Sequence, residues 1–150
     1  MSVRATHRKF GSQQLQDVTQ KGLLAQLALP RDAVAAHRVI SGGIGTVVIG
    51  KIALDFAIEP AAVCRWAGID RTTFARRDKS AEKRLSVSQS AVVYSMVRAL
   101  DAAVEMFDGD KHKALNWFRT PARSLGGQAP MEMLSTPAGA DAVLLMLSVL

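Results

Sequence analysis

The chain has 150 residues, of which 49% are hydrophobic and 21% charged, so it can build a core and is not wholly disordered. Its net charge is +6, and its single cysteine, Cys64, excludes an internal disulfide. No apolar run reaches the roughly 20 residues that a membrane-spanning helix needs, and no secretory signal follows the basic start. We expect a cytoplasmic protein that does not cross a membrane.

Basic charge is concentrated in the first part of the chain. Residues 1–40 carry six basic and two acidic side chains, and residues 41–90 carry eight and five. Residues 91–150 carry five basic and six acidic side chains, which makes this last part nearly neutral. The asymmetry predicts that the front of the chain meets an anionic partner and that the back meets protein.

The first 40 residues are predicted to be a basic arm followed by helices. Residues 13–29 can form a helix with a loose apolar period, and Asp32 is placed to cap a short alanine-rich helix over 33–40. A Ser-Gly-Gly sequence then breaks the pattern. Over 46–56 the β-branched content favours a strand but the apolar spacing favours a helix, and we expect the helix.

Two short helices with a tight connection follow. Pro60 fits the first turn of a helix, and Gly68 suits the left-handed position at which helices end. Asp70 is then a good N-cap for a second helix over 71–77. Two helices joined by a three-residue, glycine-containing turn are typical of a helix-turn-helix, so we predict such a domain over residues 41–85.

Residues 86–150 are predicted to form a second, smaller helical domain. A long helix runs to about Phe107, Asp110 caps a short helix, and a last helix follows Thr136-Pro137. Nowhere does the sequence show sustained strand alternation. We therefore predict an all-α protein with a basic arm and helix over 1–40, a helix-turn-helix domain and a small helical binding or dimerisation domain.

Motifs for catalysis, cofactors and metals are weak in this sequence. The segment Gly45–Lys51 matches most of a phosphate-binding loop, but Ile52 stands where the magnesium-binding Ser or Thr is needed, so a buried helix is the stronger interpretation. The three histidines are far apart and outside metal-ligand spacing, and Cys64 fits a buried thiol better than a nucleophile. We predict no enzyme activity, no cofactor and no metal.

The basic segment 70–84 is the strongest signal for function. In a helix-turn-helix the second helix enters the major groove of DNA by its N-terminal part, and basic residues further along reach phosphates. The alternative is an ordinary solvated basic helix face. The residues predicted to bind DNA are Arg71, Thr72, Thr73, Arg76, Arg77 and Lys79.

The back half carries an ordered string of short motifs. They are AVEMFDG at 103–109, KALNWF at 113–118, Thr120-Pro121, Leu125-Gly126-Gly127, APMEML at 129–134 and STPAGA at 135–140. Together they resemble the C-terminal domain of the Xre/MbcA/ParS family of bacterial antitoxins. Thr73-Phe74-x-Arg76-Arg77 is similar to the recognition helix of that family's Xre-like domain, so the likeness covers about residues 40–150.

The resemblance implies an antitoxin of a type II toxin–antitoxin pair. In that family the usual partner is a RES-domain toxin, which degrades NAD, and the C-terminal domain binds this toxin and blocks its active site. The family's antitoxins dimerise and can repress their own operon through the N-terminal domain. We therefore expect a homodimer with two partners, a cognate RES-domain toxin and operator DNA.

The exposed parts of the C-terminal motifs are the predicted toxin contacts. These residues are Trp117, Arg119, Pro121, Arg123, Gly126 and Gly127. Considered alone, Trp117 favours a core position, and Leu125 and Leu134 are expected in the core. The alternative function is a stand-alone helix-turn-helix repressor whose C-terminal domain only dimerises, and an enzyme with an unrecognised site is a third, less favoured hypothesis.

Overall fold

A computed structural model describes residues 22–150, and every regular element in this range is helical. The elements are α2 (Leu23–Gln26), α3 (Ala33–Gly42), α4 (Val47–Phe56), α5 (Pro60–Ala67), α6 (Arg71–Lys79), α7 (Val87–Met106), α8 (Lys111–Arg119), η1 (Arg123–Leu125), η2 (Pro130–Met133) and α9 (Pro137–Ser148). The β structure within 22–150 is limited to an isolated antiparallel bridge between Gly45 and Arg84. The all-α prediction is confirmed, whereas the predicted arm and most of the predicted helix over 13–29 lie outside the described residues.

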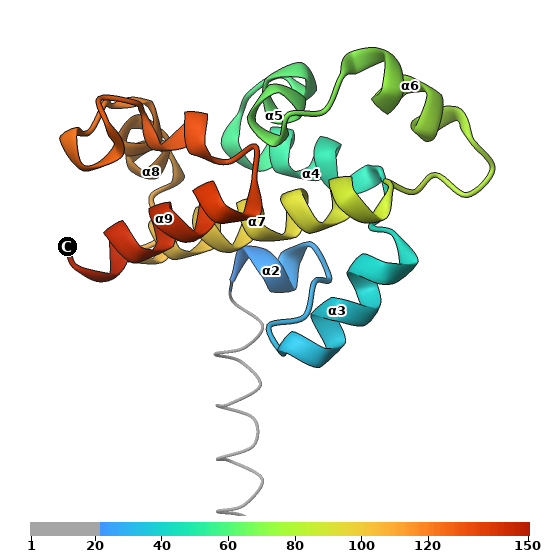
Figure 1. The fold of residues 1–150 in the computed structure, drawn as a ribbon, viewed down its shortest axis with the longest axis horizontal. Coiled ribbons are helices and arrows are strands. Elements are labelled where there is room, and N and C mark those ends of the chain that lie inside the picture. Colours follow the sequence, from blue (N-terminus) through green and yellow to red (C-terminus); the bar gives the residue numbers. More distant parts are fainter. Residues whose placement is uncertain (1–21) are drawn as a thin grey trace, which may run out of the picture.

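Helix α7 is the axis of the fold (Figure 1). A capping box begins it: Gln89 N donates to Ser86 Oγ at 3.1 Å, and Ser86 N donates to Gln89 Oε1 at 3.0 Å. Helices α2, α3 and α5 pack against α7, as do α8 and α9, and the contact with α9 is the most extensive. Because α7 meets elements from both predicted domains, it sets their positions relative to one another.

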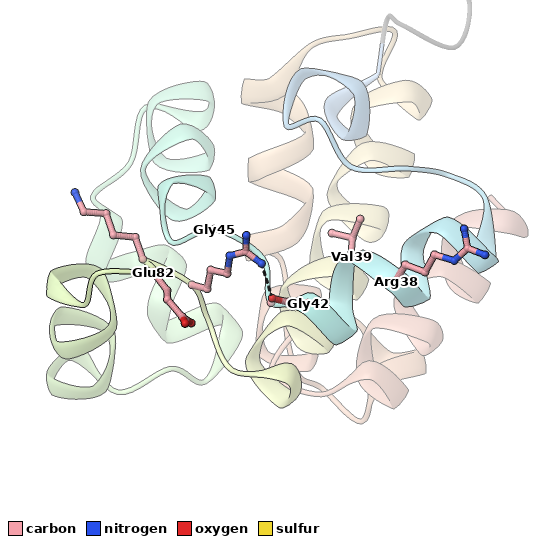
Figure 2. A pocket seen from close by; sticks show the side chains of 8 residues that line it. Arg38, Val39, Gly42, Gly45 and Glu82 are labelled. Carbon is pink, nitrogen blue, oxygen red and sulfur yellow. Dashed lines mark hydrogen bonds between the residues drawn. The ribbon is translucent and has the colours of Figure 1, made fainter.

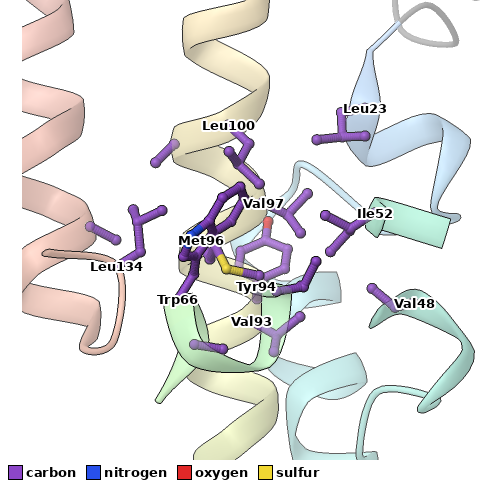
Figure 3. Close-up of a cluster of buried hydrophobic side chains, with 14 of the residues drawn as sticks. Leu23, Val48, Ile52, Trp66, Val93, Tyr94, Met96, Val97, Leu100 and Leu134 are labelled. Atoms are coloured by element: carbon purple, nitrogen blue, oxygen red, sulfur yellow. The ribbon is translucent and has the colours of Figure 1, made fainter. Parts of the chain in front are cut away.

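The buried side chains form one continuous cluster around α7 (Figure 3). Leu23 comes from α2, Ile52 from α4 and Trp66 from α5. Met96 of α7 and Leu134, which follows η2, extend the cluster toward the C-terminal elements. All three predicted regions of the chain therefore contribute to one core, while their division into domains stays a prediction.

One carboxylate ties the segment before α3 to α7. Asp101, buried on α7, accepts a hydrogen bond from Leu23 N at 2.7 Å and forms an ion pair with Arg31 at 2.9 Å. Tyr94 Oη, also on α7, donates to Pro30 O at 2.6 Å. The hydrogen bond and the ion pair compensate the negative charge of Asp101, which would otherwise be costly to bury. Together with the Tyr94 bond, they hold residues 22–31 against the core.

Capping residues place the helix starts where the sequence predicts them. Asp32, Asp70 and Asp110 each accept a hydrogen bond from the backbone N–H three residues on, at 2.9, 3.2 and 3.0 Å. One helix end differs: α3 runs two residues beyond the predicted position 40, to Gly42, and its C-cap is Gly43, whose φ is +84°. A Cβ at Gly43 would lie 2.8 Å from Leu85 O, so the chain turns there only with glycine.

Helices α5 and α6 form the predicted helix pair. Gly68 ends α5 in the left-handed conformation, with φ of +66°. A Cβ at Gly68 would lie 3.2 Å from Ser135 Cβ, so this turn also packs against the C-terminal part of the chain. Of the apolar side chains in and between the two helices, Val63 and Ile69 are buried and Phe74 is half-buried against the core.

Candidate functional site

Helix α6 projects from the body of the molecule at the end opposite α8 and α9 (Figure 1). It buries no residue completely, and Phe74 is the residue through which it packs against the core. Its N-terminus is capped by Asp70, whose carboxylate accepts from Thr73 N at 3.2 Å. Near its C-terminus, Asp78 accepts a hydrogen bond from Thr46 Oγ1 at 2.8 Å. The Asp70 bond thus caps the helix itself, and the Asp78 bond to Thr46 ties a helix that the core holds only weakly to a distant segment of the chain.

The six residues predicted to bind DNA all lie on α6. Their side chains are exposed at Arg71, Thr72, Arg76 and Lys79 and half-buried at Thr73 and Arg77. The last turn of α6 holds three of the cations, and none of the ion pairs formed within residues 22–150 involves this helix. The helix therefore presents positive charge that the described chain does not neutralise, which suits a polyanion.

The other sequence features near this helix pair are structural. Burial raises the pKa of the Cys64 thiol, and the Arg71 guanidinium opposes this effect only in part, so the thiol stays protonated at neutral pH. The near-match to a phosphate-binding loop is the start of α4, in which Val48 and Ile49 are buried.

Across 22–150, no three His, Cys, Asp or Glu side chains gather as they do around a metal ion. In the same range, no helix has the length and hydropathy of a membrane span.

The residues predicted to contact the toxin cluster at a second surface, formed by the end of α8 and the loop that contains η1. Those that are exposed are Arg119, Pro121, Arg123, Gly126 and Gly127. Trp117 is half-buried, and its ring meets the fully buried Phe118 edge to face, with centroids 5.1 Å apart and an interplanar angle of 81°. Trp117 thus supports the core with one part of its surface and leaves another part accessible.

The loop around η1 closes mainly on its own backbone. Ala122 N donates to Gln128 O, and Gly127 N donates to Ala122 O, both at 3.0 Å. Leu125, expected in the core, is only half-buried and does not belong to the core cluster. Leu134 is fully buried, as predicted. The expectation for Leu125 is wrong because backbone bonds, rather than packing, hold this loop at the surface.

Helix α9 adds an exposed apolar strip that the sequence motifs do not single out. Leu145 is 69% exposed, and Val149 and Leu150 just beyond it are 77% and 70% exposed. Ser124 Oγ donates to Met146 Sδ at 3.5 Å, which joins the η1 loop to α9 beside this strip. The signal available in the sequence is that residues 142–147 of the last helix are all apolar, more than a core-facing stripe requires.

The two surfaces lie at opposite ends of α7 (Figure 1). This helix has 20 residues, so its axis is about 30 Å long. An ion pair also links the two halves, since Lys111 Nζ on α8 lies 2.7 Å from Asp55 Oδ1 on α4. The described chain thus carries a basic polar surface and, well separated from it, an apolar surface with exposed arginines.

A family model and two relatives match this chain. The family model described as the antitoxin Xre/MbcA/ParS C-terminal toxin-binding domain matches residues 102–148, a range that includes α8, η1, η2 and α9. An Antitoxin Xre from Yersinia enterocolitica is 37% identical over 101 residues, which cover 67% of this chain and 68% of the relative. An Antitoxin Xre from Photorhabdus laumondii is 32% identical over 104 residues, which cover 69% of this chain and 70% of the relative.

Proposed function

This chain belongs to the Xre antitoxin family, and from that premise we propose that it neutralises a cognate RES-domain toxin by covering the toxin's active site. The observation that carries the proposal is that the match to a toxin-binding domain coincides with the second surface, formed by the end of α8, the η1 loop and α9. An antitoxin acts by binding its partner, so we infer no catalysis by this chain.

The chemistry of the second surface suits a protein partner. The apolar strip of α9 supplies area that gains free energy when it is removed from water, and the exposed arginines Arg119 and Arg123 beside it can pair with carboxylates at the rim. Gly126 and Gly127 have no side chains, so the partner's backbone can approach the loop closely. Trp117 provides an aromatic group of the kind that often dominates interface energies.

Co-expression with the product of the adjacent reading frame tests the toxin proposal. We expect that product to stop growth and deplete cellular NAD when expressed alone, and to co-purify harmlessly with this chain. The double variant Arg119→Glu, Arg123→Glu should lose the rescue of growth, whereas Arg38→Glu on the exposed face of α3 should keep it. A neighbour that is harmless would contradict the antitoxin role, and a toxic neighbour that leaves NAD unchanged would contradict the RES assignment.

The second part of the proposal is that α6 binds operator DNA and so lets the protein repress its own operon. The cations of α6, which no acidic side chain of the described chain neutralises, are the observation that supports it. Replacing both Arg76 and Arg77 by alanine removes two phosphate contacts, so the slope of log affinity against log salt should fall by about two. Replacing Arg123 by alanine, at the other end of the molecule, should leave the slope of log affinity against log salt unchanged. An unchanged slope in the double variant would contradict the assignment of α6.

A stand-alone repressor that dimerises through its C-terminal part is the alternative function. The α9 strip favours it, because three exposed apolar residues also suit a second copy of the chain. Light scattering on the purified chain decides the oligomeric state, with a homodimer giving twice the monomer mass of 16.1 kDa. If the adjacent gene product is neither toxic nor bound, the repressor hypothesis replaces the antitoxin proposal.

A further inference from the structure

The turn between α6 and α7, residues 80–84, has a fixed position although all five of its side chains are exposed. Hydrogen bonds to two neighbouring segments hold its main chain. These bonds run from Ser80 Oγ to Arg77 O (2.7 Å), from Lys83 N to Ser80 Oγ (3.2 Å), from Thr46 N to Lys83 O (2.9 Å) and from Leu85 N to Ile44 O (2.8 Å). Since no side chain of the turn enters the core, polar bonds set its position.

Lys83, in this turn, has a backbone conformation that is rare for lysine. Its φ is +49°, in the left-handed region that glycine adopts without strain and that residues with a Cβ adopt at a cost. Thr46, which is 2% exposed, holds this conformation, because its N and Oγ1 lie 2.9 and 3.2 Å from Lys83 O. Glycine would adopt this conformation with less strain, so Lys83→Gly can remove the side chain without loss of stability.

Lys83 lines an open groove of about 360 Å³ between the turn and the end of α3 (Figure 2). Two arginines also line it, but they are directed elsewhere: Arg84 donates to Gly42 O at 2.9 Å, and Arg38 extends along α3 away from Gly45 (Figure 2). Among residues 22–150, no carboxylate forms an ion pair with the Lys83 ammonium. Within the described chain the Lys83 ammonium is therefore exposed and outside any ion pair, as is the Arg38 guanidinium, and the Glu82 carboxylate also lines the groove.

The turn adjoins the part of α6 that carries most of its positive charge. Ser80, which accepts from Lys83 N, donates to the carbonyl of Arg77 in the last turn of α6. Thr46 links the same two elements, because its hydroxyl lies 2.8 Å from Asp78 Oδ1 and 3.2 Å from Lys83 O. Lys83 thus stands next to a cluster of exposed cations on a neighbouring element, in a geometry that shared hydrogen bonds fix.

We propose that Lys83 contacts a backbone phosphate of the same DNA that α6 binds, with Thr46 as the positioning residue that holds the turn. This inference rests on the proposed binding of operator DNA. An ammonium group is a compact charge with three donors and suits a phosphate oxygen. A contact of this kind fixes the register of the protein on the duplex and carries no sequence information itself.

Glycine and arginine substitutions test the proposal with the full-length protein and a labelled duplex from directly upstream of its own gene. Lys83→Gly removes the charge and relieves the left-handed backbone. Ala57→Gly is the matched control, because Ala57 has a φ of +53° and lies after α4, outside the turn. We expect both glycine variants to melt at the wild-type temperature or above it. Only Lys83→Gly should weaken DNA binding, by about three- to tenfold, and lower the salt slope by about one.

Lys83→Arg keeps the charge and should keep both the affinity and the slope, which separates loss of charge from loss of order in the turn. If Lys83→Gly binds the duplex as Ala57→Gly does, with the wild-type slope, the phosphate contact is overturned while operator binding stands. If Lys83→Arg loses as much affinity as Lys83→Gly, the charge is not what matters and the contact is also overturned. A wild-type protein that binds neither this duplex nor a scrambled one overturns operator binding and this inference together.

Discussion

The two ends of the molecule are held by different forces. At the end formed by α8, η2 and α9, fully buried side chains such as Phe118, Leu134 and Val143 lie directly beneath the candidate toxin surface. At the α6 end no residue of the helix is fully buried, and the hydrogen bonds of Thr46 and Asp70 provide much of the order. One surface therefore takes its rigidity from the core, and the other depends on a few polar contacts. Substitutions in the core and at the polar contacts should therefore have different effects on stability and on binding.

Matched phenylalanine substitutions should show the difference most strongly. Phe118→Ala removes a fully buried ring and should lower the free energy of unfolding by about 3–5 kcal/mol. Phe74→Ala removes a half-buried ring from α6 and should cost clearly less, about 1–2 kcal/mol. Urea denaturation of both variants measures the two losses. Equal losses would show that α6 is packed as firmly as the opposite end of the molecule.

A substitution at Thr46 can remove the hydrogen bond that holds α6 with little change in side-chain shape. Thr46→Val keeps the volume of the side chain but loses the hydroxyl bond to Asp78, which should cost about 1–2 kcal/mol of stability. DNA affinity should fall severalfold because α6 loses a fixed orientation, while binding of the toxin stays at the wild-type level. Thr46→Ser, which keeps the hydroxyl, should restore DNA binding. Equal DNA affinities for the valine and serine variants would contradict a positioning role.

The smallest effect on stability is expected on the exposed face of α9. Leu145→Ser changes a side chain that is largely in water, so the free energy of unfolding should move by no more than about 0.5 kcal/mol. Affinity for the toxin should still drop about tenfold, as when an apolar anchor is lost from an interface. Leu147→Ser, at a buried position two residues on, is the control that should destabilise the fold. Unchanged toxin affinity in Leu145→Ser would exclude the strip from the interface.

Features that depend on neighbouring residues in the sequence are predictable, and the helices illustrate this. Asp70 and Asp110 as N-caps and Gly68 as a left-handed helix end follow from local backbone chemistry, and each takes that role in the structure. The α4 helix was ambiguous because its β-branched residues also suit a strand. Burial of Val48 and Ile52 on one side decides for the helix, and only the tertiary fold supplies that burial.

Features that bring distant segments together could not be predicted from one sequence. Thr46 lies 32 residues before Asp78 and 37 before Lys83, and no local pattern indicates that its hydroxyl meets both. The exposure of Leu145 likewise depends on which side of α9 faces α7, since apolar residues occur on all its sides. Motifs in the sequence are enough to name the candidate contacts on α6 and around η1. The hydrogen bonds and packing that hold these residues in place are visible only in the folded structure.

If the chain has a DNA-binding end and a separate toxin-binding end, substitutions on α6 should leave neutralisation of the toxin intact. The most direct test is growth of cells that express the product of the adjacent reading frame together with the Arg76→Ala, Arg77→Ala variant. We expect full rescue of growth by this variant, although it no longer represses its own promoter, because the proposed toxin surface lies at the other end of α7. Failure of rescue by a variant that is folded and abundant would contradict the separation of the two surfaces.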